Sequence, residues 1–221
     1  FTYHEDYLIH AKNEGLLDKD IFVVGNTIVE VANDIKNKLI KENSYWSNPQ
    51  KKHILLDVHR PENFKYKDRI EKIIEMCNEY SIIYNLPVKM LDFGRTTQYL
   101  KDFNIDLGKI ELIPLMGYIE FIKAQLESKF VVSDSGSASE ECPILEIPLI
   151  VPRDYSERPQ CYRYNNAYKF YLNNFESELD RSIDWINNWK KENSKVEWLR
   201  NGLKDGETTS QKIVDILKEK L

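Results

Sequence analysis

The chain has 221 residues, of which 42% are hydrophobic and 30% are charged, the proportions of an ordinary soluble globular protein. This length accommodates one large domain or two small ones. A net charge of −5 lacks the basic footprint of a nucleic-acid-binding protein, and no apolar run approaches the roughly 20 residues that cross a membrane. We therefore expect neither nucleic acid nor membrane among its partners.

Cysteine and histidine usage argues against a disulfide framework and against a metal site. The cysteines Cys77, Cys142 and Cys161 are odd in number and show no C-x-x-C spacing, and the four histidines are scattered. The opening residues FTYHEDYLIH show no signal-peptide pattern. These features predict reduced thiols in a cytoplasmic protein.

Apolar runs alternate with amphipathic stretches along most of the chain. The runs predict strands at residues 21–24, 53–58, 88–92, 110–113, 130–132 and 148–151. Apolar residues at helical spacing predict helices at residues 6–15, 27–41, 67–84, 96–103, 118–127 and 138–145. We expect Thr27 to cap the second helix, and residues 42–52 and 59–64 to form loops.

The pattern changes beyond residue 161. Residues 162–174 are aromatic and rich in Asn, and we expect them to be irregular. Helices are predicted at residues 175–192, 197–203 and 210–220.

About six alternations of strand and helix predict an α/β fold, in which a parallel sheet carries helices on both faces. Ligands of such sheets bind at the carboxyl ends of the strands. Each loop with chemically interesting residues follows a predicted strand, and these loops are 25–26, 59–60, 93–95, 133–137 and 153–159. We therefore expect them to form one site.

The turn 133–137, with sequence SDSGS, joins a predicted strand to a predicted helix. Small residues and a Gly at the start of a helix leave backbone N–H groups and the positive end of the helix dipole available to a phosphate. From spacing alone, helix capping is the favoured interpretation. Arg153 and Arg158 follow the next strand and add positive charge, or are simply surface residues.

Two other positions have both a functional and a structural interpretation. His59 ends a buried strand beside Arg60, where it can bind a phosphate oxygen or move a proton near neutral pH. The alternative is a hydrogen-bonded structural histidine. Tyr118 and Phe121 lie three residues apart on a predicted helix, a spacing that is also typical of core residues.

Taken together, these motifs resemble those of the non-hydrolysing UDP-N-acetylglucosamine 2-epimerases. The likeness rests on SDSG-x-x-x-EE-x-P-x-L from Ser133, R-D-x-x-ERP from Arg153, HR-x-EN from His59, PLMGYIEFI at 114–122 and GNT at 25–27. The chain departs from the family pattern at Pro61, Ser137 and Ser139. It also carries DFGRT at 92–96 in place of a His-Pro pair, so the regulatory substrate site of bacterial members is not carried over.

The resemblance implies a doubly wound, Rossmann-like sheet that is the C-terminal half of a two-domain glycosyltransferase-B-type fold. Residues 1–221 would be a single UDP-binding domain, with C-terminal helices at about 175–221 and without the usual N-terminal catalytic domain. The implied activity is C2 inversion of a UDP-2-acetamido sugar, between the UDP-GlcNAc and UDP-ManNAc types, by elimination and re-addition of UDP. It uses no cofactor and belongs to polysaccharide biosynthesis.

The isolated chain is expected to be inactive without its N-terminal half, and the full-length protein to be a homodimer. The resemblance implies a catalytic role for His59 and UDP binding by nine residues: Arg60, Glu62, Asn63, Phe121, Ser135, Gly136, Ser137, Glu141 and Arg158. In this scheme Phe121 lies against uracil, Ser135 and Gly136 hold the diphosphate, Glu141 accepts hydrogen bonds from the ribose hydroxyls, and Arg158 complements phosphate or orients the sugar. The chemistry agrees, since phosphates need N–H donors and cations, and vicinal hydroxyls suit a carboxylate.

Three other functions remain open at this point. The substrate is alternatively a UDP-2-acetamido-2,6-dideoxy-L-hexose, as the departures at Pro61, Ser137 and Ser139 allow. A glycosyltransferase of the same two-domain type would transfer the sugar without solvent exchange at C2. A non-catalytic UDP-sugar-binding domain would bind UDP and show no turnover.

Overall fold

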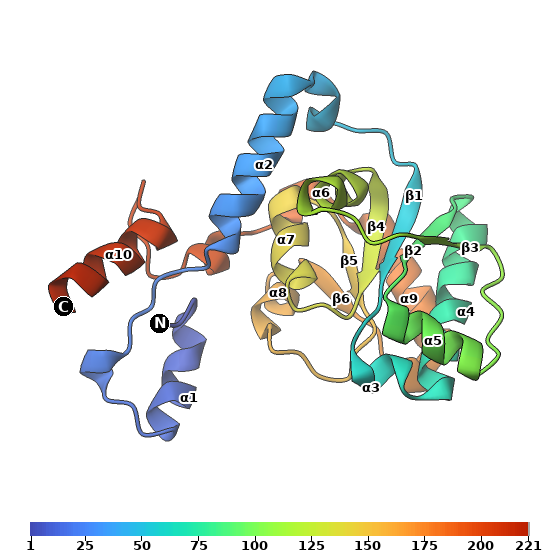
Figure 1. Cartoon of the computed structure of the whole chain (residues 1–221), viewed down its shortest axis with the longest axis horizontal. Coiled ribbons are helices and arrows are strands. Elements are labelled where there is room, and N and C mark those ends of the chain that lie inside the picture. The colour runs from blue at the N-terminus through green and yellow to red at the C-terminus, as the bar shows by residue number, and fades with distance from the viewer. Residues whose placement is uncertain (221) are drawn as a thin grey trace.

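The computed structural model describes residues 1–220, in which a six-stranded sheet is covered by helices on both faces (Figure 1). All strand pairings are parallel, in the order β3-β2-β1-β4-β5-β6. This is the strand order of a doubly wound Rossmann sheet, so the predicted fold class is confirmed. The strands are β1 (His53–Asp57), β2 (Val88–Leu91), β3 (Ile110–Ile113), β4 (Ser128–Ser133), β5 (Leu149–Val151) and β6 (Ala167–Lys169).

The helices largely follow the apolar periodicity of the sequence. The α-helices are α1 (Leu8–Asn13), α2 (Ile28–Glu42), α3 (Pro61–Phe64), α4 (Lys67–Tyr84), α5 (Gly94–Asp102), α6 (Tyr118–Leu126), α7 (Ala138–Leu145), α8 (Pro159–Arg163), α9 (Phe175–Asn188) and α10 (Thr209–Lys220). Short 3-10 helices are η1 (Glu5–Tyr7), η2 (Asp18–Asp20), η3 (Ser44–Ser47), η4 (Leu172–Asn174), η5 (Lys191–Asn193) and η6 (Glu197–Arg200). No helix in the described part of the chain combines the length and apolar character needed to cross a membrane.

The central strand β1 contributes to two separate hydrophobic cores. Ile54 and Leu56 pack with α4 and α9 on one face, whereas Leu55 packs with α6 and α7 on the other. Successive strand residues point to opposite faces, and both faces of this strand are covered. Burying each such side chain contributes about 2 kcal/mol, so the middle of β1 has three consecutive apolar residues instead of an alternating pattern.

Both ends of the chain lie on the same side of the molecule, next to α2 (Figure 1). Thr2 forms a parallel bridge with Val23, and the Ser210 N–H donates to a carboxylate oxygen of Glu30 at 3.0 Å. α10 is therefore attached to α2, whereas the N-terminal segment is attached to α8, where Gln160 Nε2 donates to Asp6 at 2.8 Å and Arg163 pairs with the same carboxylate.

The structure corrects the predicted set of strands. Residues 21–24 are not a strand of the sheet; in the described part of the chain, Val23 forms an isolated parallel bridge with Thr2. The sixth strand is instead β6, inside the stretch 162–174 that was expected to be irregular. β6 has three residues and pairs with one neighbour, so it leaves little periodic signal in the sequence.

Several helix predictions also differ from the structure, among them the predicted helix 197–203, which is the short 3-10 helix η6. The expected loop 59–64 contains α3, because Pro61 starts a turn in which the Arg60 carbonyl accepts hydrogen bonds from the N–H groups of Asn63 and Phe64. Asn26, not Thr27, caps α2, since the Asn26 side-chain oxygen accepts from the Ile28 N–H at 3.0 Å. α9 ends four residues earlier than predicted, where the backbone becomes extended.

Candidate functional site

Loops that follow β1, β4 and β5 meet at the carboxyl edge of the sheet. β1 and β4 are neighbours, with Asp57 opposite Ser133, so the residues that follow them lie close together. A cleft of about 380 Å³ opens there. It is lined by Asp57, His59, Leu91, Phe93, Leu115, Met116, Tyr118, Phe121, Ser135 and Ser137.

His59 is held at this cleft by a buried carboxylate. His59 Nδ1 lies 2.9 Å from Asp57 Oδ1, and the other Asp57 oxygen accepts from Ser133 Oγ at 2.9 Å. A carboxylate can only accept, so Nδ1 carries the proton and Nε2 is left for a ligand. The hydrogen bond to Asp57 raises the pKa of His59 above its ordinary value, although burial acts in the opposite direction. The imidazolium form is thereby favoured.

Asp134 ties the turn after β4 to the loop after β1. This side chain is 0% exposed, and it accepts hydrogen bonds from the backbone N–H groups of His59 and Arg60, each at 3.0 Å. The Asn63 amide donates to the same carboxylate at 3.0 Å. Burial raises the pKa of Asp134, while these donors act to lower it. Asp134 therefore fixes the backbone that presents His59 and Arg60.

Two predicted UDP-binding residues, the buried Asn63 and the partly exposed Glu62, contact other side chains of the chain. Asn63 is 0% exposed, and its side-chain oxygen also accepts from Arg69 Nε at 3.2 Å. Glu62 Oε1 lies 2.8 Å from Arg153 Nη2 and accepts from the Tyr155 hydroxyl at 3.3 Å. The structure thus places Asn63 behind the cleft and joins Glu62 to the loop after β5.

Two guanidinium groups approach the turn between β4 and α7. A Cβ atom built on Gly136 would lie 3.7 Å from Arg60 Nη2 and 3.8 Å from Arg158 Nη2. Arg158 also pairs through Nε with Glu140, and its guanidinium carbon lies 5.2 Å from the centre of the Tyr3 ring. Burial raises the pKa of Glu140, and the charge of Arg158 opposes that rise.

The same turn offers small polar groups beside these cations. The hydroxyls of Ser135 and Ser137 lie 2.9 Å apart, and the Ser135 N–H donates to Ser133 Oγ at 3.0 Å. The Ser135 N–H is therefore occupied, but the N-terminal N–H groups of α7 face the turn. Two arginines, two hydroxyls and a helix N-terminus suit an anion such as a phosphate.

Glu141 lies next to the cleft under the cover of Tyr118. The Tyr118 hydroxyl donates to Glu141 Oε1 at 2.9 Å, and Gln125 Nε2 donates to Oε2 at 3.1 Å. Glu141 is 4% exposed, and burial raises its pKa. The Tyr118 hydroxyl therefore lies between the Glu141 carboxylate and the cleft.

Aromatic and aliphatic side chains form one wall of the cleft. Phe121 lies on α6, and the Phe93 ring is centred 4.8 Å from the His59 ring. Leu115 and Met116 extend this wall along the loop before α6. An apolar wall opposite the polar turn fits a flat ring that is joined to an anionic group.

Three residues that hold the site together have no role among those predicted from the sequence. Asp57 orients His59, Asp134 orients the loop after β1, and Gln125 contacts Glu141. Asp57 and Asp134 end a strand or directly follow one, which is a signal that could have singled them out. Gln125 carries no such signal, because it lies at a buried position of an otherwise apolar helix face.

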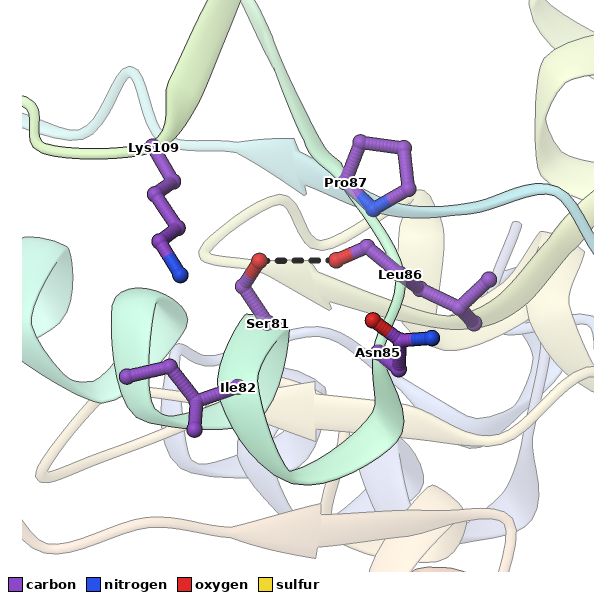
Figure 2. A pocket seen from close by; sticks show the side chains of 6 residues that line it. All are labelled: Ser81, Ile82, Asn85, Leu86, Pro87 and Lys109. Carbon is purple, nitrogen blue, oxygen red and sulfur yellow. Dashed lines mark hydrogen bonds between the residues drawn. The ribbon is translucent and has the colours of Figure 1, made fainter.

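A larger cavity, of about 500 Å³, lies at the opposite edge of the sheet (Figure 2). Residues just before β2 and β3 line it, including Pro87 and Lys109, and the Ser81 hydroxyl donates to the Leu86 carbonyl at 2.8 Å. Despite its size, this cavity lies at the amino ends of the strands, away from the edge where such sheets bind ligands. The cleft at the carboxyl edge is therefore the better candidate.

The comparisons with known proteins point to one family. The chain matches the family described as UDP-N-acetylglucosamine 2-epimerase over residues 1–218. The UDP-N-acetylglucosamine 2-epimerase of Methanocaldococcus jannaschii is 34% identical over 166 residues, which are 68% of this chain and 45% of that protein. The enzyme of the same name from Methanococcus maripaludis is 30% identical over 200 residues, which are 82% of this chain and 54% of that protein.

A solved structure extends the match to the fold. The crystal structure of Methanocaldococcus jannaschii UDP-GlcNAc 2-epimerase in complex with UDP-GlcNAc and UDP matches 99% of this chain, with a TM-score of 0.84 and 29% identity. The matched part is 60% of that chain. This chain therefore spans about half the length of the curated relatives that it matches.

Proposed function

The chain belongs to the UDP-N-acetylglucosamine 2-epimerase family, and from this membership we propose that it is the UDP-binding half of a UDP-sugar 2-epimerase. The observation that carries the proposal is the approach of Arg60 and Arg158 to the turn at Gly136, beside a cleft that His59 and an apolar wall line. One anionic donor molecule would span these features, with its diphosphate at the turn and its base against the wall.

We propose distinct roles for the residues of this cleft. Phe121 lies against uracil, the turn at Gly136 holds the diphosphate between Arg60 and Arg158, and Glu141 accepts hydrogen bonds from the ribose hydroxyls. The roles of the remaining predicted residues are proposed from their contacts. Ser135 and Ser137 offer hydroxyls to the diphosphate, while Asn63 and Glu62 keep the loop after β1 in place.

The proposed reaction is an elimination followed by an addition. A base removes the proton at C2 of the sugar while the bond between C1 and the UDP oxygen breaks, which gives a glycal and UDP. A proton then returns to C2 from the opposite face, and UDP adds back at C1, which gives the C2 epimer. No change in oxidation state occurs, so the scheme needs no redox cofactor.

This chain would act on the leaving group. Negative charge grows on the diphosphate as the C1–O bond breaks, and Arg60, Arg158 and the N-terminus of α7 are aimed at that region. His59, whose pKa is raised by Asp57, adds a positive charge or a proton to the departing oxygen. The base and acid at C2 belong, in this proposal, to the other half of the protein.

We propose that the other half is an N-terminal catalytic domain that packs against the side formed by the N-terminal segment and α10. Several apolar side chains are exposed there, among them Ile9, Leu16, Leu17 and Val214. Residues 1–221 would then be one UDP-binding domain. We further propose that the full-length protein is a cytoplasmic homodimer, and the three cysteines, which are buried and free, are consistent with a reducing compartment.

Two experiments test the proposal. Calorimetry with UDP on the 221-residue chain measures the UDP affinity of this half alone, and we expect binding. The chain joined to its N-terminal half is then incubated in heavy water with UDP-GlcNAc or with a UDP-2-acetamido-2,6-dideoxy-L-hexose. Deuterium at C2 of the first sugar supports the stated substrate, and deuterium at C2 of the second alone moves the assignment to that sugar.

The alternatives give separate results in the same assays. Transfer of the sugar to an acceptor without deuterium at C2 would show a glycosyltransferase. Binding of UDP without exchange at C2 of either sugar would show a non-catalytic binding domain. Absence of UDP binding by both the chain and the joined protein would refute the proposal that this chain binds UDP.

A further inference from the structure

The carboxylate of Glu141 has two side-chain donors that are held very differently. Gln125 donates to Oε2 at 3.1 Å and is 0% exposed, at the bottom of the packing between α6 and α7. Tyr118 donates to Oε1 at 2.9 Å, is half-buried, and lines the cleft. One donor therefore belongs to the interior, whereas the other stands between the carboxylate and the space where a ligand would lie.

Gln125 is locked in one orientation. Its side-chain oxygen accepts from the Cys142 thiol at 3.6 Å, and its backbone carbonyl accepts from Ser128 Oγ at 2.7 Å. A carboxylate can only accept, so the Gln125 amide must present its NH₂ group to Glu141. Both ends of the amide are thus engaged with buried groups, and Gln125 fixes the plane of the Glu141 carboxylate.

Glu141 has acceptor capacity to spare. An ionised carboxylate offers about four lone-pair sites, and Gln125 and Tyr118 use one on each oxygen. Because Tyr118 lines the cleft and donates to Oε1, Oε1 is the carboxylate oxygen on the cleft side. The Tyr118 hydroxyl has the same donor chemistry as the hydroxyl of a sugar.

We propose that Gln125 is a positioning residue that orients Glu141 toward a ribose diol, and that the Tyr118 hydroxyl occupies the place of one ribose hydroxyl until the ligand displaces it. This inference rests on the proposed function, since it assumes that the cleft binds UDP. It adds a specificity, because the cleft would select a ribonucleotide over its 2′-deoxy counterpart. Gln125 supports this selection by holding Glu141, without itself contacting the ligand.

The two donors predict opposite effects when they are removed. Gln125→Met keeps the approximate volume but loses the NH₂ donor, so the Glu141 carboxylate is free to rotate and its charged form loses support. We expect Kd for UDP to rise about tenfold and Kd for 2′-deoxy-UDP to change less than about threefold. Tyr118→Phe removes the hydroxyl that the ligand must displace, and we expect it to tighten UDP binding about threefold.

Calorimetry with UDP and with 2′-deoxy-UDP on the 221-residue chain tests this inference. Ile122→Val is the matched control, because Ile122 is a buried α6 residue of the same apolar cluster and should leave both affinities unchanged. Thermal unfolding checks that each variant folds. If Gln125→Met does not fold, Gln125→Asn, which is one methylene shorter, is measured instead with the same expected result.

The outcomes separate this inference from the proposed function. A wild-type chain that does not bind UDP would refute both. A wild-type chain that binds UDP and its 2′-deoxy form equally well would leave UDP binding intact and refute the role of Glu141 and Gln125. Loss of UDP affinity that is equal in Gln125→Met and Tyr118→Phe would refute the displacement of Tyr118. A selective loss in the first and a gain in the second support the inference.

Discussion

Replacing Arg158 by Met tests the proposed diphosphate site at the turn around Gly136. The guanidinium lies near Gly136 together with that of Arg60, and it also pairs with Glu140. Met has an aliphatic side chain of nearly the same length, so most of the packing against the Tyr3 ring is kept. The charge and the donors toward the turn are lost.

The expected size of the effect follows from the hydrogen bonds at stake. A hydrogen bond to a charged group contributes about 1.5–3 kcal/mol. If Arg158 donates to the diphosphate, its loss should raise Kd for UDP about 10- to 150-fold. Uridine has no phosphate, so its affinity should change less than about twofold.

Calorimetry with UDP and uridine measures this difference directly. Arg158→Met also leaves the buried Glu140 unpaired, so the double variant Arg158→Met/Glu140→Gln separates that effect from the lost cation. Arg163→Met is the matched control, because Arg163 lies on the neighbouring helix and pairs with Asp6 instead. An equal loss of affinity for UDP and uridine, or a loss for UDP below about threefold, would refute the placement of a phosphate at this turn.

Three further substitutions test other parts of the structure. The hydrogen bond to Asp57 raises the pKa of His59, so the stability that this pair contributes is present below the ordinary histidine pKa and is lost as pH rises through the raised value. Urea unfolding at several pH values should show this loss of stability in the wild type and not in His59→Gln. Gly136→Ala should change the free energy of unfolding by less than about 0.5 kcal/mol, because its Cβ makes ordinary contacts, yet it should weaken UDP binding by filling the space between two guanidinium groups; a large loss of stability would contradict the described turn. Gly202→Ala should destabilise the fold by about 2 kcal/mol or more, since its φ is +79° and the new Cβ would lie 2.6 Å from the Val23 carbonyl oxygen; Gly206→Ala, with a φ of +76° and open space around it, is the control for φ alone.

Much of the fold was predictable from local patterns. α4 spans the predicted residues 67–84, because apolar side chains recur there at helical spacing and face one core. β1 was predictable from the consecutive apolar residues Ile54, Leu55 and Leu56, which are typical of a strand buried on both faces. β6 was not predictable, because its place depends on a free edge of β5 and not on its own three residues.

The candidate site was predictable in its chemistry and less so in its contacts. The sequence brought His59, Ser135 and Arg158 to loops that follow strands, and parallel strands bring such loops to one edge. It could not show that Glu62 would pair with Arg153, which lies 91 residues away, or that Asn63 would be buried behind Asp134. Those partners are set by how the loops cross in space.

The sequence by itself determined the alternation of elements and the parallel sheet, because apolar periodicity is a local property and strands that are joined through helices pair in parallel. Only the tertiary structure decided which side chain contacts which. Gln125 acquires its role from α7, a helix that starts 13 residues later, because burial forces each polar group to find a partner among those that packing brings within reach.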